Sequence, residues 1–465
     1  MKIVFFSSEV FPFAKTGGMA DVCGALPLAY EQLGNAVVVF LPYYKCVELD
    51  HKNVQEVSPG VYLTWMGEYI RVFFIKNDEL FGREGLYGDP SGDYADNLER
   101  FQCFCQKSLE VLKQQEIKAD ILHSHDWQTA LIPVYVKYAL QEDPFYKEMK
   151  TVISLHNLAY QGLFPEEEFA KLNLSQDVFD DAGFEFFGKM SLLKAGIVTS
   201  DLVTTVSPTY AKEIQTKEQG CGLDDVLRAR EESMIGILNG LDYSIWNPKA
   251  DSLLASKYSK EGLEGKRKNK HALQKMAKLA IKPEVPVFGF VGRLSHQKGI
   301  DLIEEAMEDI IAQDIQFVFL GVGEEKYELL LKELAARYPD KISVNIAFDE
   351  KMAHQIYAGS DFFLMPSQYE PCGLSQMISL RYGTIPVVHR TGGLADTVTP
   401  FDQDGNGFVF DEYTKDAFVS VVSGAVDFYQ GRSAFAALVE KAFTYDFSWK
   451  ESAKQYLGLY HQCFL

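Results

Sequence analysis

The chain has 465 residues, of which 47% are hydrophobic and 24% charged, and its formal net charge at pH 7 is −20. A single hydrophobic core rarely organises a chain of this length, so we expect two domains of an ordinary globular protein. The negative charge argues against nucleic acid or an anionic membrane as a partner, because both would repel the chain at long range. A small anionic ligand remains compatible with it, since a local cluster of lysine and arginine can override the mean field.

The cysteines and apolar segments indicate the cellular compartment. The seven cysteines are scattered and form no Cys-x-x-Cys pair, which argues against a disulfide framework or a structural zinc site. No run of about 18 apolar residues could span a membrane, and the apolar segment at residues 2–8 is too short for a signal sequence. We therefore expect a cytoplasmic protein, or a plastid protein if the source is a photosynthetic eukaryote.

The first half of the chain alternates short apolar segments with segments of helical periodicity. A loop rich in proline and glycine covers residues 11–19. The strand, loop, helix and strand that open the chain are typical of one half of a doubly wound α/β domain. The patterns predict strands at residues 2–8, 36–41, 70–75, 121–123, 152–155 and 202–206, and helices at residues 21–34, 99–114 and 130–140.

The amino-acid composition of the sequence changes after Asn239, and we expect a domain boundary near residue 245. Residues 247–282 are polar and rich in lysine, and the basic run at residues 266–270 favours a solvated helix face over a binding patch. A second α/β series follows, and residues 447–460 form a last predicted helix. The series has predicted strands at residues 287–291, 317–320, 342–346, 362–365, 385–388 and 407–410, and helices at residues 300–311, 326–338, 352–357 and 374–382.

The turn at residues 15–21 (KTGGMAD) follows the first predicted strand. The glycine pair Gly17 and Gly18 allows a backbone to approach a ligand closely. Lys15 and the N-terminus of the next helix could both meet a phosphate. The alternative is a tight turn in which Asp21 is a favourable first-turn charge.

Two further turns of the first domain combine imidazole, carboxylate, amide and aromatic groups. They are HSHDWQ at residues 123–128 and HNLAYQG at residues 156–162. A metal site is the less favoured interpretation, because no third ligand has matching spacing. A sugar-binding surface fits better, since an aromatic ring packs on a pyranose face while acids and amides bind its hydroxyls.

The second domain carries its cations in the turn at residues 292–299 (GRLSHQKG). Arg293 can bind a diphosphate through two parallel hydrogen bonds, and Lys298 supplies a point charge. An exposed surface loop is the alternative. A second glycine-paired loop, at residues 391–397, again joins a predicted strand to a helix.

The segment at residues 362–376 (FFLMPSQYEPCGLSQ) places one acid, Glu370, between a short apolar strand and a helix. Ligands of open α/β sheets bind at this end of the strands. The backbone N–H groups of Gly373, Leu374 and Ser375 could face an anion or a hydroxyl. The alternative is a helix that a nearby acid merely stabilises.

These turns divide between the two predicted domains. The simplest arrangement is a cleft in which the loops of one sheet face those of the other. A phosphate-bearing donor would then lie mainly on the second domain, and an acceptor would come from the first.

The motifs together resemble one family, that of bacterial glycogen synthases and plant starch synthases, over nearly the whole chain and in the same order. They are Lys-Thr-Gly-Gly-x-Ala-Asp-Val at residues 15–22, His-x-His-Asp-Trp-Gln at 123–128, His-Asn-Leu-Ala-Tyr-Gln-Gly at 156–162, Thr-Val-Ser-Pro-Thr-Tyr-Ala at 205–211, Gly-Arg-Leu-x-x-Gln-Lys-Gly at 292–299 and Pro-Ser-x-x-Glu-Pro-Cys-Gly-Leu at 366–374.

The resemblance implies a GT-B fold, an α/β architecture of two doubly wound, Rossmann-like domains facing across a deep cleft. It implies an N-terminal domain at residues 1–245, a nucleotide-sugar-binding domain at 246–445, and a C-terminal helix within 446–465 that packs back on the first domain. The implied reaction transfers glucose from ADP-glucose to the non-reducing end of an α-1,4-glucan, with retention at the anomeric carbon and release of ADP. It needs no metal and no cofactor, and it serves glycogen biosynthesis.

The resemblance also implies roles for individual residues. Arg293 and Lys298 bind the diphosphate, and Glu370 with nearby backbone N–H groups holds the glucose hydroxyls. His156 lies by the glucose 6-hydroxyl and the reacting centre. The implied catalytic residues are Glu370, Lys298, Arg293, His156 and Asp126.

Further residues are implied to bind the donor or the glucan. Lys15 and the glycine turn reach the phosphates, Asp21 contacts the sugar region, and Phe348 stacks on adenine where relatives often have tyrosine. Ser375 stands where the family usually has threonine, and Met19 replaces leucine. The implied binding residues are Lys15, Gly17, Gly18, Asp21, Trp127, Asn157, Asn239, Gln297, Phe348, Cys372, Gly373, Leu374 and Ser375.

Other functions remain as alternatives to ADP-glucose transfer. A UDP-glucose-dependent glycosyltransferase would share the fold, and only a donor assay separates the two. A nucleotide-sugar epimerase fits the motifs less well, and pyridoxal-dependent phosphorylases of this fold are much longer. A catalytically dead glucan-binding scaffold would be expected to have lost Arg293, Lys298 or Glu370, and all three are present.

Overall fold

The computed structural model describes residues 1–49, 53–89 and 91–464 and divides into two compact α/β units. The first unit contains Met1–Gly240 together with the C-terminal segment that begins at Trp449. The second unit contains Leu241–Ser448. Within the described residues, no helix is both long and apolar enough to cross a membrane.

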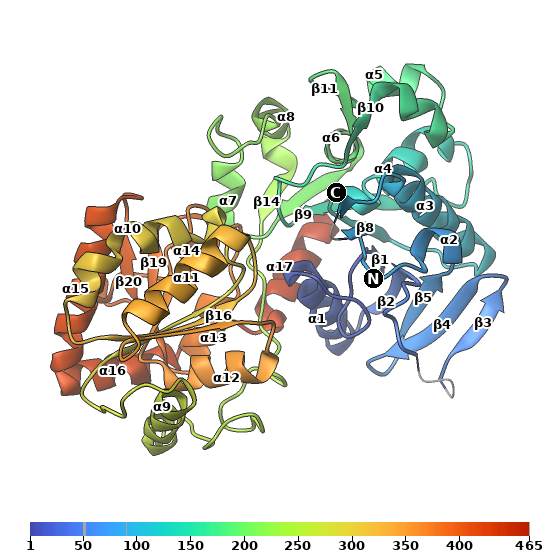
Figure 1. Cartoon of the computed structure of the whole chain (residues 1–465). Helices are drawn as coiled ribbons and strands as arrows, with labels where there is room; N and C mark the ends of the chain where they lie inside the picture. Colours follow the sequence, from blue (N-terminus) through green and yellow to red (C-terminus); the bar gives the residue numbers. More distant parts are fainter. Residues whose placement is uncertain (50–52, 90, 465) are drawn as a thin grey trace. The chain divides into compact units, whose positions relative to one another are not determined.

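The first unit is built on a nine-stranded sheet in the order β14-β13-β9-β8-β1-β2-β5-β4-β3 (Figure 1). The strands from β14 to β5 run parallel, and β4 and β3 add an antiparallel edge. The strands are β1 (Lys2–Phe6), β2 (Ala36–Pro42), β3 (Gln55–Ser58), β4 (Val61–Met66), β5 (Ile70–Ile75), β8 (Ile121–His125), β9 (Lys150–Leu155), β13 (Leu202–Thr205) and β14 (Met234–Gly236).

Helices join and cover these strands. The helix predicted at residues 130–140 is a short α4 that continues as a π-helical turn at Tyr135–Ala139. Two small sheets, β6–β7 and β10-β12-β11, lie outside the main one. The helices are α1 (Gly18–Gln32), α2 (Asp78–Phe81), α3 (Asn97–Gln114), α4 (Leu131–Val134), α5 (Asp177–Asp181), α6 (Leu192–Thr199), α7 (Pro208–Glu213), α8 (Asp224–Ala229) and α17 (Trp449–Gln462), and the minor strands are β6 (Gly88–Asp89), β7 (Gly92–Asp93), β10 (Leu163–Pro165), β11 (Glu185–Phe186) and β12 (Lys189–Ser191).

The C-terminal helix α17 packs within the first unit, against α1. The Tyr30 hydroxyl donates to the Tyr460 hydroxyl at 3.0 Å, and both side chains are fully buried. The Tyr460 hydroxyl also lies 2.7 Å from Nδ1 of His123 on β8. Helix α17 therefore completes the part of the core that lies between α1 and β8.

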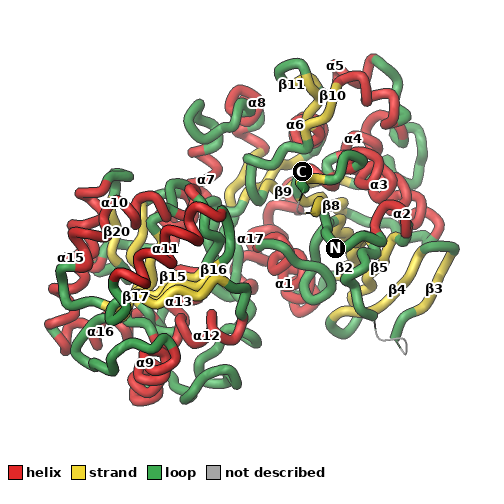
Figure 2. The backbone as a smooth tube through the Cα atoms, in the orientation of Figure 1, coloured by secondary structure: helices red, strands yellow, loops and turns green. Residues whose placement is uncertain are grey.

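The second unit contains a six-stranded parallel sheet in the order β17-β16-β15-β18-β19-β20 (Figure 2). Every strand and helix predicted for this half is present within a few residues of its expected bounds. The elements are β15 (Val287–Val291), β16 (Gln316–Gly321), β17 (Ile342–Ile346), β18 (Phe362–Met365), β19 (Ile385–His389), β20 (Phe408–Phe410), α9 (Glu264–Met276), α10 (Ile300–Ile311), α11 (Glu325–Arg337), α12 (Glu350–Gly359), α13 (Ser375–Arg381), α14 (Gly392–Thr397), α15 (Lys415–Gln430) and α16 (Arg432–Ala442).

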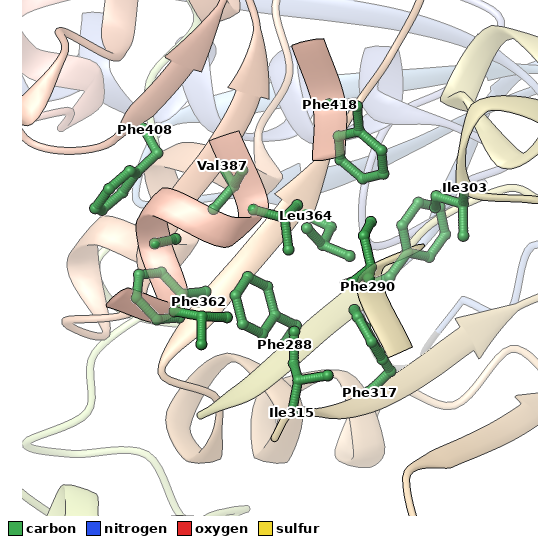
Figure 3. Packing of buried hydrophobic residues seen from close by; sticks show 14 of the residues in the cluster. Phe288, Phe290, Ile303, Ile315, Phe317, Phe362, Leu364, Val387, Phe408 and Phe418 are labelled. Atoms are coloured by element: carbon green, nitrogen blue, oxygen red, sulfur yellow. The ribbon is translucent and has the colours of Figure 1, made fainter. Parts of the chain in front are cut away.

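Aromatic side chains on neighbouring strands fill the core of the second unit (Figure 3). Phe288 of β15 stacks on Phe362 of β18, with ring centroids 4.7 Å apart. Phe317 of β16 lies on the other side of Phe288, at 5.6 Å. The apolar runs that predicted parallel strands are therefore the runs that bury the sheet on this face.

The basic run on α9 corrects a prediction. Lys266 and Lys270 are buried, so the predicted solvated face was wrong for them, whereas Arg267 and Lys268 are exposed. The Lys266 ammonium donates to the carbonyls of Ala358, Ser360 and Tyr382 and to the Thr384 hydroxyl, and burial lowers its pKa to about 7. These contacts satisfy carbonyl groups at helix and strand ends that the fold removes from water.

Lys270 forms a buried ion pair with Asp361, with Nζ and Oδ2 2.6 Å apart. Removing one partner of such a pair leaves an uncompensated charge, so we expect Lys270→Met to destabilise the second unit by about 3 kcal/mol. Arg267→Met, on the same helix but with a side chain 79% exposed, should change stability by less than about 0.5 kcal/mol. Urea unfolding followed by circular dichroism measures the free energy of unfolding of both variants. Equal losses would show that the Lys270–Asp361 pair stabilises the unit no more than an exposed side chain does.

Candidate active site

The predicted site residues of the second unit lie where the strand order of its sheet reverses. From β15 the chain adds β16 and β17 on one side, and then returns to add β18, β19 and β20 on the other. The loops that follow β15 and β18 therefore leave neighbouring strands at the same edge of the sheet. Open α/β sheets bind ligands at this switch point.

Lys298 and Glu370 meet there. The Lys298 ammonium lies 2.5 Å from Glu370 Oε2, and the Ser367 hydroxyl donates to the same oxygen at 3.1 Å. Glu370 is only 6% exposed. The two turns that the sequence singled out separately thus form one constellation of a cation and an acid.

Arg293 and Gln297 connect the same two loops. Arg293 Nη2 donates to Gln297 Oε1 at 3.1 Å. Gln297 in turn donates from Nε2 to the Tyr369 carbonyl at 3.4 Å, and its own carbonyl accepts from Gln368 N at 3.0 Å. Gln297 therefore orients the exposed Arg293 guanidinium and holds the loop that precedes Glu370.

Three glycines pack directly on the backbone of this loop. A Cβ added at Gly299 would lie 2.1 Å from the Pro366 carbonyl oxygen, and one at Gly392 2.0 Å from that of Glu370. A Cβ at Gly393 would lie 2.0 Å from the Cys372 carbonyl oxygen. The glycine-paired loop after β19 thus supports the segment around Glu370, a role that the sequence did not indicate.

The remaining predicted residues of the second unit surround this loop. Cys372 is buried, Gly373 has a φ of +71°, and Leu374 precedes α13. The Tyr357 hydroxyl donates to the hydroxyl of Ser375, the first residue of α13, at 2.9 Å. Phe348 follows β17 and its side chain is 86% exposed, so its ring is available to a ligand.

The first unit has a corresponding switch point between β1 and β8, from which the chain extends to either side. After β1, Lys15 forms an ion pair with Asp21 at 2.6 Å, and Gly18 opens helix α1. A Cβ added at Gly17 would meet no atom within 4 Å, so the turn has open space beside it.

Glu9 holds this turn in place, and the sequence analysis missed it. Its Oε2 accepts from the backbone N–H groups of Thr16 and Gly17, at 2.5 and 3.0 Å. Its Oε1 accepts from the hydroxyls of Thr16 and Tyr87, at 2.6 and 2.7 Å. The available signal was a lone acid between the serine pair that ends the predicted strand and the apolar segment at residues 10–14.

Asp126 follows β8 in a strained conformation. Its φ of 55° and ψ of −170° lie in a region that only glycine adopts readily. Its Oδ1 accepts from His156 N at 2.7 Å. Burial raises the pKa of the carboxyl to about 7, although the backbone N–H groups of His156 and Asn157 oppose this rise.

The residues around Asp126 complete the first-unit site. Trp127 packs edge-on against Phe101, and Gly162, with a φ of +61°, lies so close that a Cβ there would be 2.5 Å from the indole. Asn157 Oδ1 accepts from the Ala159 N–H at 3.1 Å. Asn239, after β14, is buried, and its Oδ1 has no hydrogen-bond partner among the described residues.

The imidazoles of His123, His125 and His156 contact one another next to Asp126. His125 Nδ1 lies 3.0 Å from His156 Nε2, and the His123 and His125 ring centroids are 4.3 Å apart. Burial lowers the pKa of His123 to about 3, that of His156 to about 4, and that of His125 well below its usual range. These rings are therefore neutral hydrogen-bonding groups at ordinary pH.

The structure thus gathers the predicted residues into two groups. Arg293, Lys298 and Glu370 form the group of the second unit, and Asp126 and His156 form that of the first. The described part of the chain holds no cluster of three or more His, Cys, Asp or Glu side chains that could bind a metal ion.

Two Rossmann-like units, each with polar side chains at the switch point of its sheet, form the GT-B architecture, and the family models place the chain among glycosyltransferases. The fold alone is shared with sucrose-phosphate synthase from Thermosynechococcus elongatus, at 17% identity and a TM-score of 0.62 over 100% of this chain and 99% of that one. Two family models match: the starch synthase catalytic domain at residues 2–229 and glycosyl transferases group 1 at residues 273–428.

Closer relatives cover the whole chain. The glycogen synthase of Geotalea daltonii is 45% identical over 99% of this chain and 98% of its own, and that of Geotalea uraniireducens is 46% identical over the same shares. The catalytic domain of starch synthase IV from Arabidopsis thaliana, bound to ADP and acarbose, is 33% identical, with a TM-score of 0.90 and 99% of both chains covered. The chain belongs to the family of glycogen and starch synthases, and it is therefore a glucosyltransferase.

Gly393→Ala tests the support of the Glu370 loop. Gly393 is not in the left-handed region, so the added methyl acts only through its clash with Cys372. A displacement of about 1 Å at a catalytic loop costs about 100-fold in rate, and we expect a loss of that order. Gly424→Ala, in the middle of α15 with no atom within 4 Å of the new Cβ, should keep the activity and raise stability by up to about 1 kcal/mol. Glucose-transfer rates and urea unfolding measure both, and full activity of Gly393→Ala would contradict the proposed support.

Asp126→Asn tests the buried carboxyl. In the folded chain its pKa lies above the unfolded value of 3.8, so folding binds a proton and this group's contribution to stability falls as pH rises from about 4 to about 7. The free energy of unfolding that Asp126→Asn gains over wild type should therefore grow with pH in that window, by about 4 kcal/mol at most. The exposed Asp93→Asn is the control for the same substitution at the surface, and the Asp126→Asn values are compared with it at each pH. Urea titrations at pH 4, 6 and 8 measure the difference in free energy of unfolding between Asp126→Asn and wild type. A difference that shrinks as pH rises would refute the raised pKa of Asp126.

Proposed function

We propose that this protein transfers glucose from ADP-glucose to the non-reducing end of an α-1,4-glucan, with retention at the anomeric carbon and release of ADP, in glycogen biosynthesis. The observation that supports this most directly is the pairing of Lys298 with Glu370 at the switch point of the second unit. A cation for the diphosphate and an acid for the sugar hydroxyls are thereby held side by side.

Charge develops on the leaving diphosphate when the bond to the anomeric carbon breaks. Arg293 and Lys298 stabilise this charge, and because they are fixed by the loop contacts, little reorganisation is needed as it forms. The Lys298 ammonium has three donors, so it can bind a phosphate oxygen while it keeps its hydrogen bond to Glu370. The neutral adenine ring packs on the exposed Phe348 ring.

Glu370 binds glucose hydroxyls in this mechanism and is not a nucleophile. Its Oε2 already accepts from Lys298 and Ser367, which disperses the charge that a nucleophilic carboxylate would need. Retention then follows from attack on the face that the diphosphate leaves, with a phosphate oxygen taking the proton of the acceptor hydroxyl. The backbone N–H groups of Cys372, Gly373 and Leu374 bind the remaining sugar hydroxyls, and Ser375 contacts the distal phosphate.

The residues of the first unit bind the sugars. His156 donates to the glucose 6-hydroxyl, while Asp126 holds the backbone of His156 in place. Trp127 offers its ring to a sugar face, and Asn157, Asn239 and Asp21 bind hydroxyls. Lys15, with the turn that Glu9 holds, contributes a further phosphate contact.

The partners of this reaction are ADP-glucose and the glucan. The solved starch synthase relative that is bound to ADP and acarbose supports a nucleotide-sugar donor and a glucan acceptor. We propose the cytoplasm as the compartment, because the curated relatives described above are bacterial. These relatives give no support to a plastid.

The donor assay tests the function, with glucose transfer to glycogen measured from ADP-glucose and from UDP-glucose without added metal. We expect kcat/KM to favour ADP-glucose clearly, and Lys298→Ala to lower kcat/KM at least about 100-fold, which corresponds to the loss of about 3 kcal/mol of transition-state stabilisation. The exposed Lys268→Ala on α9 serves as the matched control and should keep wild-type activity.

Each other outcome has a defined meaning. A preference for UDP-glucose would keep the chemistry and overturn the assignment of Phe348 to adenine. A fall in melting temperature for Lys298→Ala without a fall in kcat/KM would reduce the turn at residues 292–299 to a surface loop. No transfer from either donor would favour a glucan-binding scaffold.

A further inference from the structure

The hydrogen bond between His125 and His156 places a second histidine directly behind a proposed catalytic one. We infer that His125 is a positioning residue that donates from Nδ1 to Nε2 of His156 and thereby fixes His156 in the tautomer that carries its proton on Nδ1. The catalytic consequence rests on the proposed function of His156, whereas the tautomer itself does not.

The backbone of both residues is held from several sides. His125 ends β8 and pairs with Ser154 of the parallel neighbour β9, which His156 follows directly. The Thr129 hydroxyl accepts from His125 N at 2.6 Å and donates to the His125 carbonyl at 2.9 Å. With His156 N bonded to Asp126, the two rings meet at a fixed distance of 3.0 Å between Nδ1 and Nε2.

Only one proton can occupy this contact. Burial lowers the pKa values of both rings far enough that each is neutral near pH 7 and carries a single N–H. Either His125 donates from Nδ1, or His156 donates from Nε2. In the second case the proton of His125 must lie on its own Nε2.

The surroundings of His125 Nε2 decide between the two cases. This atom is buried and has no hydrogen-bond partner among the described residues. Phe5 stacks on the His125 ring at 5.0 Å and 24°, and His123 lies against it at 4.3 Å and 31°. Phe5 is stacked on the ring and His123 is tilted against it by 31°, so neither stands perpendicular to it and offers its π face to an N–H in the ring plane.

An N–H at this position would therefore be an orphaned buried donor, which is rare and costly. A bare ring nitrogen there also lacks a partner, but buried acceptors without a partner are commoner than buried N–H donors without one. The lower-energy arrangement keeps the His125 proton on Nδ1 and directs it to His156 Nε2. The proton that His156 can offer a sugar hydroxyl is then on Nδ1, and the opposite tautomer would offer a lone pair at that atom.

The tautomer can be read directly by NMR. The full-length protein labelled with ¹⁵N-histidine gives long-range ¹H–¹⁵N correlations at pH 7.5, and the His156 signals are assigned by their loss in His156→Ala. We expect a protonated Nδ1 and an unprotonated Nε2 in wild type. The reverse pattern, or an even mixture of tautomers, would overturn the inference whether or not any variant folds.

Variants then test the cause. His125→Phe keeps a ring between Phe5 and His123 but has no donor, so the ¹⁵N shift of His156 Nε2 should move to that of a lone pair that accepts no hydrogen bond. His125→Asn offers an amide N–H near the position of Nδ1 and should move this shift back toward the wild-type value. Tyr460→Phe, which removes the hydroxyl beside His123 Nδ1, is the matched control: it should move the His123 signals and leave the His156 tautomer unchanged.

Kinetics connect the hydrogen bond to the reaction. Loss of the partner that orients a metal-binding histidine typically costs about 10-fold to 100-fold, and we expect a similar fall in kcat for His125→Phe, while KM for ADP-glucose stays within about 2-fold. His125→Asn should recover most of kcat. An unchanged ¹⁵N shift of His156 Nε2 in His125→Phe overturns the inference. Full activity of His156→Ala would instead refute the proposed role of His156 and leave the tautomer assignment standing.

Discussion

The site of the second unit depends on backbone packed against backbone. Gly299, Gly392 and Gly393 each lie so close to a carbonyl of the loop at residues 366–372 that no side chain could be accommodated. Because these contacts are between backbone atoms and involve no flexible side chains, they fix the position of this loop relative to the sheet. These contacts also fix the positions of Lys298 and Glu370 relative to each other. Lys298 directly precedes Gly299, and Glu370 lies in the loop at residues 366–372. Catalysis by fixed charges requires such rigidity, because a misplaced charge must otherwise move during the reaction.

The site of the first unit depends on burial. Exclusion of water keeps His123, His125 and His156 neutral and holds a proton on Asp126 up to about pH 7. Each of these groups would be charged more readily in water, so the fold gives up stability at this point. In return it obtains hydrogen-bond donors and acceptors whose protonation is set by geometry, which is typical of functional sites. The strained backbone of Asp126 also lowers the stability of the fold in this segment.

The sequence predicted most of the parallel strands because buried parallel strands are continuous apolar runs. It did not predict the edge hairpin of β3 and β4, where Tyr62, Leu63 and Trp65 stay partly or fully exposed and the residue pattern lacks a clear alternation. Motifs at strand ends located the candidate residues, since their chemistry is local. The burial of Lys266 could not be found in this way, because its partners are supplied by segments distant in the sequence. Glu9 was missed although it binds the nearby Thr16 and Gly17, because it lies outside the motifs.

The charge of the chain explains how its site lysines are arranged. A net charge of −20 opposes the approach of a diphosphate, so local cations must bind it, yet both lysines proposed for this task contact acids: Lys15 contacts Asp21, and Lys298 contacts Glu370. The acids hold the flexible lysine side chains in one place, which removes much of the entropy that phosphate binding would otherwise have to overcome. An ammonium has three donors and no acceptor, so one acid does not exhaust it. Arginine needs less of this help because its guanidinium is a rigid, planar fork, and Arg293 is accordingly oriented by a neutral amide, that of Gln297.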